Sequence, residues 1–369
     1  MSATDHPNHE RRRRPRPPGR CMTGITLIAL LAGAPALTAA QEGQEAVGDA
    51  PPPQETAGGL QQRTILSPQG SVTLEPSVSY TQSTARVMHI DGFTILPAIA
   101  VGLISLRETQ RESLTASLAM RYGITDRLEG ELRLPYVYRE EQVREREVLQ
   151  GAEFAGVAAS TGDGLGDVEA SLRYQLSSGR RDGVIFTGGL RVKSRTGTDP
   201  FEVETENIAL SDEDDPAEEP SIRIFTEQPT GSGFWSVQPS LSWVNPSEPA
   251  VLYGSFSYLH NIERNVDLQS GERRRIDPGD AIGVSFGMGI ALNDRTSMSL
   301  GYDHTTVLKT RTDGGPGLDA EFDRFQVGSL ILGASHRLGP RASLGLSVGV
   351  GVTEEAPDAQ VTLRLPMRF

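Results

Sequence analysis

The chain ends with the segment AQVTLRLPMRF, residues 359–369, in which apolar and polar residues alternate. An extended strand places successive side chains on opposite faces, so a period of two residues predicts a strand. About 9–11 residues are enough for a tilted strand to cross the hydrocarbon core of a bilayer. The segment therefore predicts a membrane-spanning strand. Its apolar face would carry Ala359, Val361, Leu363, Leu365, Met367 and Phe369.

The same alternation recurs from residue 71 onward and predicts an all-β protein. Thirteen stretches alternate: near 71–80, 95–106, 113–122, 127–139, 167–176, 184–194, 235–243, 251–259, 281–290, 296–304, 326–336, 343–352 and 359–369. Bacterial single-chain barrels usually have an even number of strands, so either 71–80 lies outside the wall or 85–93 adds a strand. We expect a transmembrane antiparallel up-and-down β-barrel of about 12 strands, with about 14 as the alternative.

A soluble β-sandwich would alternate in the same way, but two features favour the membrane barrel. The predicted strands have about ten to twelve residues, whereas strands of globular sheets most often have about 5–6. Aromatic residues also lie at the strand ends, where membrane barrels carry their interfacial girdles. These residues are Tyr122, Tyr136, Tyr138, Trp235, Trp243, Tyr258 and Tyr302.

The connections between the predicted strands alternate between short and long. Short turns are expected at 125–126, 177–183, 245–249, 293–294 and 339–340. Long polar loops are expected at 140–164, 196–232, 261–279 and 305–324, and the turn at 353–358 is a short exception among them. Outer-membrane barrels have short periplasmic turns and longer external loops, so this pattern favours the same class.

The composition excludes a helical membrane protein, because the 369 residues are 37% hydrophobic and the mean hydropathy is −0.31. The long apolar stretch at 22–40 follows an arginine-rich region and ends in small residues, which is typical of a secretory signal peptide. An N-terminal anchor helix is the alternative. We expect a signal peptide at 1–40, a disordered periplasmic lead-in at 41–69 and a barrel at 70–369.

Charge and cysteine content narrow the function classes further. Cys21 precedes the apolar stretch, so the mature chain would contain no cysteine for a disulfide, a metal site or thiol catalysis. The net charge of −13 argues against nucleic-acid binding, because neutralising the phosphates requires clustered basic side chains. No histidine spacing is typical of a metal site, and we expect no cofactor, no metal and no nucleic-acid partner.

If the apolar rows face lipid, the polar rows face the lumen, because a charge facing lipid near the midplane costs about 2–4 kcal/mol. The charges either fill and rigidify the barrel or set its selectivity, with Arg191, Lys193 and Arg195 as a basic stripe. The lumen-lining candidates are Arg121, Glu129, Glu131, Arg133, Glu169, Arg173, Arg191, Lys193, Arg195 and Arg364.

Two further features of the sequence bear on chemistry. His304 and Ser299 lie close together in the sequence, but their separation carries no specific signal for a hydrolase, and we expect no catalytic residue. The acidic run 202–219 lacks the alternating ligands and glycine of a calcium loop, so a solvated external loop is the preferred interpretation.

Two stretches carry a family resemblance. The segment from Tyr122 to Glu129, continuing to Tyr136, resembles the turn-and-strand signature of the transporter-like outer-membrane family named for the meta-pathway of phenol degradation. The segment from Gly164 to Val168, followed by Arg173 and Tyr174, resembles the next strand entry of that family. The resemblance implies an outer-membrane barrel that passes small molecules, including aromatic or other hydrophobic compounds. The matched residues make turns, so no binding residue is carried over.

An exported chain that ends on an aromatic residue also resembles the bacterial outer-membrane β-barrels. The resemblance implies that Phe369 belongs to the signal for assembly into the outer membrane of a Gram-negative-type bacterium. It also implies three partners, which are outer-membrane lipid, the assembly machinery and a small-molecule solute. We therefore expect a passive channel that is not an enzyme. A non-conducting barrel plugged by its loops or by its N-terminal segment is the alternative, and a barrel hydrolase is less favoured.

Overall fold

The computed structural model describes residues 66–96, 99–147, 155–177, 183–209, 221–267, 273–313, 320–322 and 324–369. The predicted signal peptide and residues 41–65 of the predicted lead-in lie outside this described part. Among the described residues, no helix is long and apolar enough to cross a membrane.

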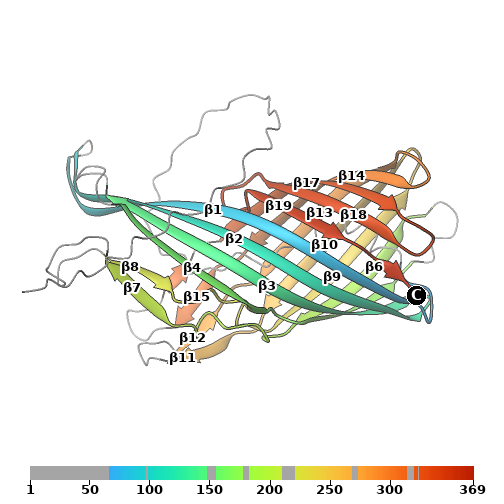
Figure 1. Cartoon of the computed structure of the whole chain (residues 1–369), viewed down its shortest axis with the longest axis horizontal. Helices are drawn as coiled ribbons and strands as arrows, with labels where there is room; N and C mark the ends of the chain where they lie inside the picture. Colours follow the sequence, from blue (N-terminus) through green and yellow to red (C-terminus); the bar gives the residue numbers. More distant parts are fainter. Residues whose placement is uncertain are drawn as a thin grey trace, which may run out of the picture. The chain divides into compact units, whose positions relative to one another are not determined.

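Within the described part of the chain, twelve antiparallel strands form a closed barrel wall (Figure 1). The barrel closes where β1 pairs with β19, with Ser77 opposite Arg364 and Gln82 opposite Ala359. In order around the wall the strands are β1 (Val72–Leu96), β2 (Ile99–Thr125), β3 (Leu128–Glu147), β5 (Glu169–Gln175), β6 (Ile185–Lys193), β9 (Ser236–Pro246), β10 (Ala250–Asn261), β13 (Ala281–Ala291), β14 (Thr296–Val307), β17 (Phe325–Arg337), β18 (Ser343–Gly351) and β19 (Ala359–Arg364).

The predicted fold class and the preferred strand count are confirmed, but the reason given for twelve strands is wrong. Residues 71–80 do not lie outside the wall, because they form the part of β1 that pairs with both β2 and β19. The two strands predicted at 95–106 and 113–122 are one strand, β2, paired with β1 and β3. Merging those two stretches leaves twelve.

The C-terminal segment predicted as one strand is also interrupted. It forms β19 and then β20 (Met367–Arg368), with Leu365 and Pro366 between them. Proline has no N–H to donate to a ladder, so it breaks the pairing at this point. The chain end is still held in the wall, because Phe369 N donates to Val72 O at 2.8 Å.

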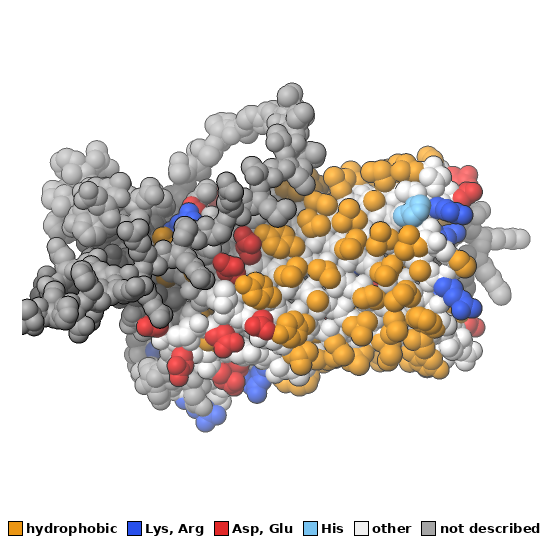
Figure 2. Space-filling view, viewed as in Figure 1, with side chains coloured by type: hydrophobic (Ala, Val, Ile, Leu, Met, Phe, Trp, Pro, Cys, Tyr) orange, Lys and Arg blue, Asp and Glu red, His pale blue; other side chains and the backbone are white. Residues whose placement is uncertain are grey.

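Apolar side chains form a belt around the outside of the barrel, shown in orange in Figure 2. On β2, Leu114, Leu118, Met120 and Tyr122 are 45–47% exposed, while Thr115, Ser117, Ala119 and Arg121, on the other face, are half-buried or buried. An exposed belt of this kind is stable only against lipid, since large contiguous apolar patches are rare on soluble monomers.

Part of what was predicted to be loop forms strands instead. Strand β3 continues to Glu147 and pairs with β4 (Ala155–Leu165), so 140–164 is largely a strand hairpin. Loop 196–232 contains β7 (Thr205–Ala209) paired with β8 (Ser221–Phe225). Loops 261–279 and 305–324 contribute a small sheet of β11 (Arg264–Asp267), β12 (Arg273–Asp277), β15 (Thr310–Asp313) and β16 (Ala320–Phe322).

The two ends of the barrel differ. The short-turn end carries the connections at 126–127, 247–249, 292–295 and 338–342, and both Gly70 and Phe369 lie there, bonded to Gly123 and Val72. The long-loop end carries the small sheets described above. This asymmetry agrees with the predicted alternation of short and long connections.

Candidate functional site

The inner face of β1, β2, β3 and β5 carries a cluster of charged side chains, which we call the charged wall. Its members are Glu75, Arg121, Glu129, Glu131, Arg133 and Arg173. Strand register brings them together, because Arg121 lies opposite Glu131 and Arg173 lies opposite Glu129. Oppositely charged residues at such cross-strand positions stabilise a sheet.

Glu131 is the central carboxylate of the charged wall. Its Oε2 accepts from Arg121 Nε at 3.0 Å and from Arg173 Nη2 at 3.2 Å, and its Oε1 contacts Arg133 Nη2 at 3.4 Å. Arg121 also pairs with Glu75, and Arg173 pairs with Glu129. The Glu131 side chain is only 7% exposed. Charges held this far from water are strongly coupled to their partners.

The charged wall has a small positive excess. Arg364 lies opposite Ser77 of β1, two residues along that strand from Glu75. Counting it, four guanidinium groups (Arg121, Arg133, Arg173 and Arg364) accompany three carboxylates (Glu75, Glu129 and Glu131). The sequence-predicted candidates from these strands are therefore brought together, except Glu169, which pairs with Arg191, and Glu75 is a member that was not predicted.

The chain before β1 lies against the charged wall. Ser67 N donates to Glu129 Oε2 at 2.7 Å, and the side chains of Leu66 and Ser67 are buried. Gly123 makes room for this segment, since a Cβ there would lie 2.1 Å from Pro68 O. Residues 66–69, part of the predicted disordered lead-in, thus occupy the inner side of the barrel at the short-turn end.

A second group of charges lies on β5 and β6. Arg191 Nη1 is 3.3 Å from Glu169 Oε1, and Lys193 Nζ is 3.6 Å from Asp167 Oδ2. Arg195 does not join them, because β6 ends at Lys193 and Arg195 is exposed. The predicted basic stripe therefore has two members, and a carboxylate lies beside each.

Asp167 fixes the break between β4 and β5. Its Oδ1 accepts from Gly197 N at 3.1 Å, and its Oδ2 accepts from Ser232 N at 2.9 Å and Ser232 Oγ at 2.7 Å. Residues 226–231 run along the free edge of β4, where Gln228 N donates to Thr161 O at 3.2 Å. This carboxylate therefore helps to attach two distant loop segments to the wall, together with Thr230 Oγ1, which donates to Leu165 O at 2.8 Å, and Thr196 Oγ1, which donates to Gly166 O at 3.0 Å.

Replacing Asp167 with alanine is expected to release residues 196–198 and 230–232 from β4, because three hydrogen bonds lose their acceptor. Limited proteolysis of the folded protein should then cleave within these segments several times faster than in the wild type. Asp358→Ala, at an exposed turn position, is the control and should leave cleavage unchanged. Equal cleavage of both variants would contradict this role of Asp167.

A compact cluster joins the long-loop segments to one another. The guanidinium carbon of Arg264 lies 5.5 Å from the ring centroids of both Phe201 and Phe234, and the same side chain pairs with buried Asp199. The two rings meet edge to face at 5.7 Å. Val266 and Ile276 complete the cluster.

Arg264→Lys keeps the charge but loses the planar stack, so we expect it to weaken this cluster by about 1–2 kcal/mol. Hydrogen exchange should rise at the amides of Phe201 and Val266 and stay unchanged in β13 and β14. Faster exchange throughout the barrel, or none at Phe201, would contradict a local role.

The inner face opposite the charged wall, on β10, β13, β14, β17 and β18, carries mostly serine, glycine and threonine. We call it the small-residue wall. A larger group interrupts it: Tyr253 is 1% exposed and packs with Val244 and Ile331. Gly287 accommodates the Tyr253 ring, which would lie 2.6 Å from a Cβ at that position.

The arrangement does not bring His304 and Ser299 together. They are five residues apart on β14, so they project to opposite faces of the strand. His304 Nδ1 instead lies 3.1 Å from the hydroxyl of Tyr302. Among the described residues, no group of three or more histidine, cysteine or acidic side chains is placed to hold a metal ion.

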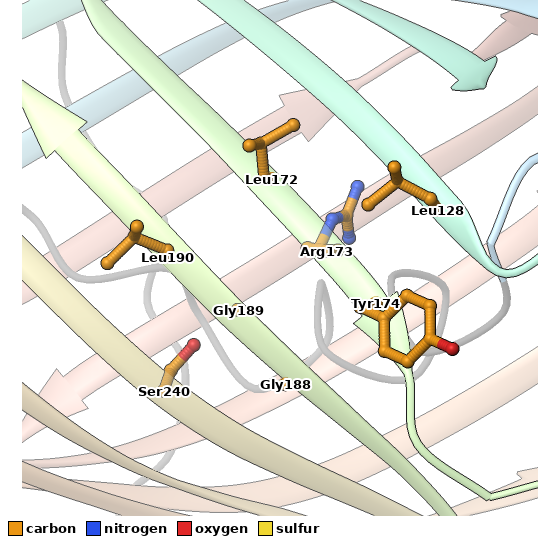
Figure 3. A pocket seen from close by; sticks show the side chains of 8 residues that line it. All are labelled: Leu128, Leu172, Arg173, Tyr174, Gly188, Gly189, Leu190 and Ser240. Carbon is orange, nitrogen blue, oxygen red and sulfur yellow. The ribbon is translucent and has the colours of Figure 1, made fainter.

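An apolar hollow of about 290 Å³ lies on the wall at β3, β5, β6 and β9, and Figure 3 shows the side chains that line it. Leu172, Tyr174 and Leu190 line it and are 46–51% exposed, while Gly188 contributes no side chain. These residues belong to the outer apolar row, so the hollow is a recess in the membrane-facing surface.

Several residues of the site were not predicted. Asp167 was predicted only as the first residue of the strand 167–176, and Asp199, Phe201 and Arg264 lie in predicted loops. Their partners are distant in the chain, so alternation along one strand carries no signal for them. Ser67 lies in the predicted lead-in, where the sequence has no alternation, so nothing there predicts that it contacts the charged wall.

A closed wall with an apolar exterior and a charged interior defines the chain as a transmembrane β-barrel. No protein-family model matches the chain. An outer membrane channel from Pseudomonas putida F1 aligns over 83% of this chain and 98% of that chain at 15% identity, with a TM-score of 0.51. This likeness supports the shared barrel fold.

Two other solved barrels align less closely. A Pseudomonas aeruginosa FadL homologue aligns over 81% of this chain and 90% of that chain at 9% identity, with a TM-score of 0.41. The translocator domain of the autotransporter NalP from Neisseria meningitidis aligns over 84% of this chain and 92% of that chain at 10% identity, with a TM-score of 0.41.

Proposed function

We propose that this protein is a passive outer-membrane channel for small solutes, among them hydrophobic or aromatic compounds. The observation that carries the proposal is the unequal lining of the barrel. Eight strands make an interior that side chains can fill, whereas 16–18 strands leave an aqueous channel. Twelve strands lie between these two cases, and we propose that solutes pass along the small-residue wall, because long charged side chains occupy the opposite one.

The sidedness follows from the connections. Short turns face the periplasm in barrels of this kind, which assigns the short-turn end to the periplasm and the long-loop end to the exterior. On this assignment, the cluster around Arg264 covers the external side and residues 66–69 lie at the periplasmic mouth. The proposed site residues remain Arg121, Glu129, Glu131, Arg133, Glu169, Arg173, Arg191, Lys193 and Arg364.

The experiment is solute entry into liposomes that contain the purified, folded protein. A small sugar and a small aromatic compound would be compared with a disaccharide in the same preparation. We expect the two small solutes to enter faster than in protein-free liposomes, and the disaccharide to enter more slowly than the sugar. Rates equal to those of empty liposomes for all three would contradict the channel.

One observation favours a second candidate, a barrel that does not conduct until its periplasmic mouth is cleared. Ser67 N is hydrogen-bonded to Glu129, and the absence of a side chain at Gly123 leaves room for residues 66–69 at the periplasmic mouth. Removal of residues 41–69 would separate the candidates, because a closed barrel would begin to pass solutes while an open channel would change little. We also propose how the protein reaches the outer membrane. The signal peptide at 1–40 is cleaved after export, and Phe369 then serves as part of the signal for assembly into the membrane.

A further inference from the structure

Three neighbouring strands of the small-residue wall end their inner-face rows in arginine at the short-turn end. Alternate residues of a strand share a face, and on β17 Leu332 is exposed on the outer face, so Ser335 and Arg337 lie at inner-face positions. The inner rows of β14 and β18 extend in the same way to Arg295 and Arg341, which lie just before these strands. The three arginines therefore lie at the same end of one wall.

A fourth arginine, Arg368 of β20, joins this group. Strand pairing places it opposite Thr73, a buried residue on the inner face of β1. Backbone hydrogen bonds link the four arginines in pairs, since Arg337 N donates to Arg295 O at 2.7 Å and Arg368 N donates to Arg341 O at 2.8 Å. All four thus lie at inner-face positions of adjacent elements, and we call them the arginine mouth.

The arginine mouth carries an excess of positive charge. All four side chains are exposed, and among the residues that the structure describes none of them takes part in an ion pair. Two carboxylates lie at the same part of the rim. Asp294 precedes Arg295 in its turn, and the chain ends at Phe369, whose O accepts from Val72 N at 3.3 Å. Four positive charges therefore accompany these two negative ones.

A solute that moves along the small-residue wall meets the arginine mouth at the short-turn end. The next inner-face residues after Arg295 and Arg337 are Ser297 and Ser335, whose hydroxyl oxygens lie 2.7 Å apart. The first carboxylate on the inner row of β14 is Asp303, eight residues from Arg295. An anion attracted by the arginines thus meets hydroxyl groups next, and rings of basic side chains are the usual lining of anion-conducting pores.

We infer that the arginine mouth makes this protein select small organic anions, which carry a carboxylate or sulfonate group, over cations of the same size. The inference rests on the proposed channel and names its substrate class. A guanidinium group stays charged and binds two oxygens of such an anion in bidentate fashion. Because these guanidinium groups are exposed to water, each contact is weak enough for the anion to leave as well as to enter.

The test measures reversal potentials in planar bilayers that contain the mature protein in dilute salt. Potassium chloride gives the anion-to-cation permeability ratio, and benzenesulfonate is then compared with benzyltrimethylammonium, an aromatic cation of similar size. The double variants R295Q/R337Q and R341Q/R368Q each remove two charges of the arginine mouth. R144Q/R324Q removes two exposed arginines at the long-loop end and is the matched control. Heat-dependent gel mobility confirms that each variant is folded.

We expect the wild type and the control to favour chloride over potassium and benzenesulfonate over benzyltrimethylammonium. Two charges about 7 Å from an anion, screened by about 0.1 M salt, change its local concentration by about threefold. Each double variant should therefore lower the permeability ratio by about threefold or more. The preference should shrink in about 1 M salt, where the screening length falls to about 3 Å.

A wild type that conducts but prefers cations, or an unchanged permeability ratio in both double variants, would overturn the inference and leave the channel standing. An equal loss in the control would assign the effect to net charge, and a chloride current without a benzenesulfonate current would exclude the substrate class; either result also overturns it. A folded protein that gives no current, both as the mature chain and after removal of residues 41–69, would instead contradict the proposed channel, and the inference would fall with it.

Discussion

For the second candidate, in which residues 66–69 close the periplasmic mouth, Gly123→Ala is expected to raise the single-channel conductance several-fold. A Cβ at position 123 would lie 2.1 Å from Pro68 O and 2.7 Å from Ser67 O, both of them backbone atoms. Contacts under 3.0 Å require that something shift. Residues 66–69 are a short segment held by few hydrogen bonds, whereas β2 is paired on both sides, so the segment should leave the periplasmic mouth.

The matched control is Gly345→Ala, because it adds the same methyl group to β18, where nothing lies within 4 Å of the new atom. Its conductance should equal that of the wild type. Planar-bilayer recordings of the three proteins check the prediction. If Gly123→Ala folds and conducts like the wild type, residues 66–69 do not limit passage.

Glu131→Gln is expected to be the most damaging single change in the charged wall. It removes the carboxylate that contacts Arg121, Arg133 and Arg173. Breaking a buried ion pair from one side costs about 3–5 kcal/mol, because the remaining charge stays buried without its partner. The denaturation midpoint should fall accordingly.

The same change should make the lumen more anion-selective, since four guanidinium groups would face two carboxylates in place of three. The reversal potential in a salt gradient measures this directly. Glu354→Gln, at an exposed turn position, removes a charge without a buried partner and serves as the control. A folded E131Q protein with an unchanged reversal potential would show that the charged wall is structural only.

Alternation predicted much of this barrel because lipid imposes it. Each of the stretches 113–122, 127–139 and 281–290 has one face in the apolar belt and one face inside, so its sequence carries the period of two residues. Arg121, Glu131 and Arg173 were proposed as lumen-lining because each lies on the polar row of its strand, and the strand register then brings them together. The outer-membrane sidedness came from the lengths of the connections.

Alternation did not predict the parts of the strands that lie beyond the apolar belt. Residues 107–112 and 140–147 are rich in charge and were not assigned to strands, but they continue β2 and β3, with Arg111 Nη2 2.6 Å from Glu141 Oε2. Beyond the belt both faces of a strand can be polar, so the alternation disappears while the pairing continues. Asp167 and Arg264 depend on contacts between loops that are far apart in the chain.

Conductance of the mature protein in a planar bilayer tests the central claim most directly. Its heat-dependent gel mobility, checked on the same sample, confirms a folded barrel. The account predicts discrete current steps, with an ion selectivity that shifts when Arg191 and Lys193 are replaced. A folded barrel that gives no steps, both as the wild type and after removal of residues 41–69, would contradict the channel.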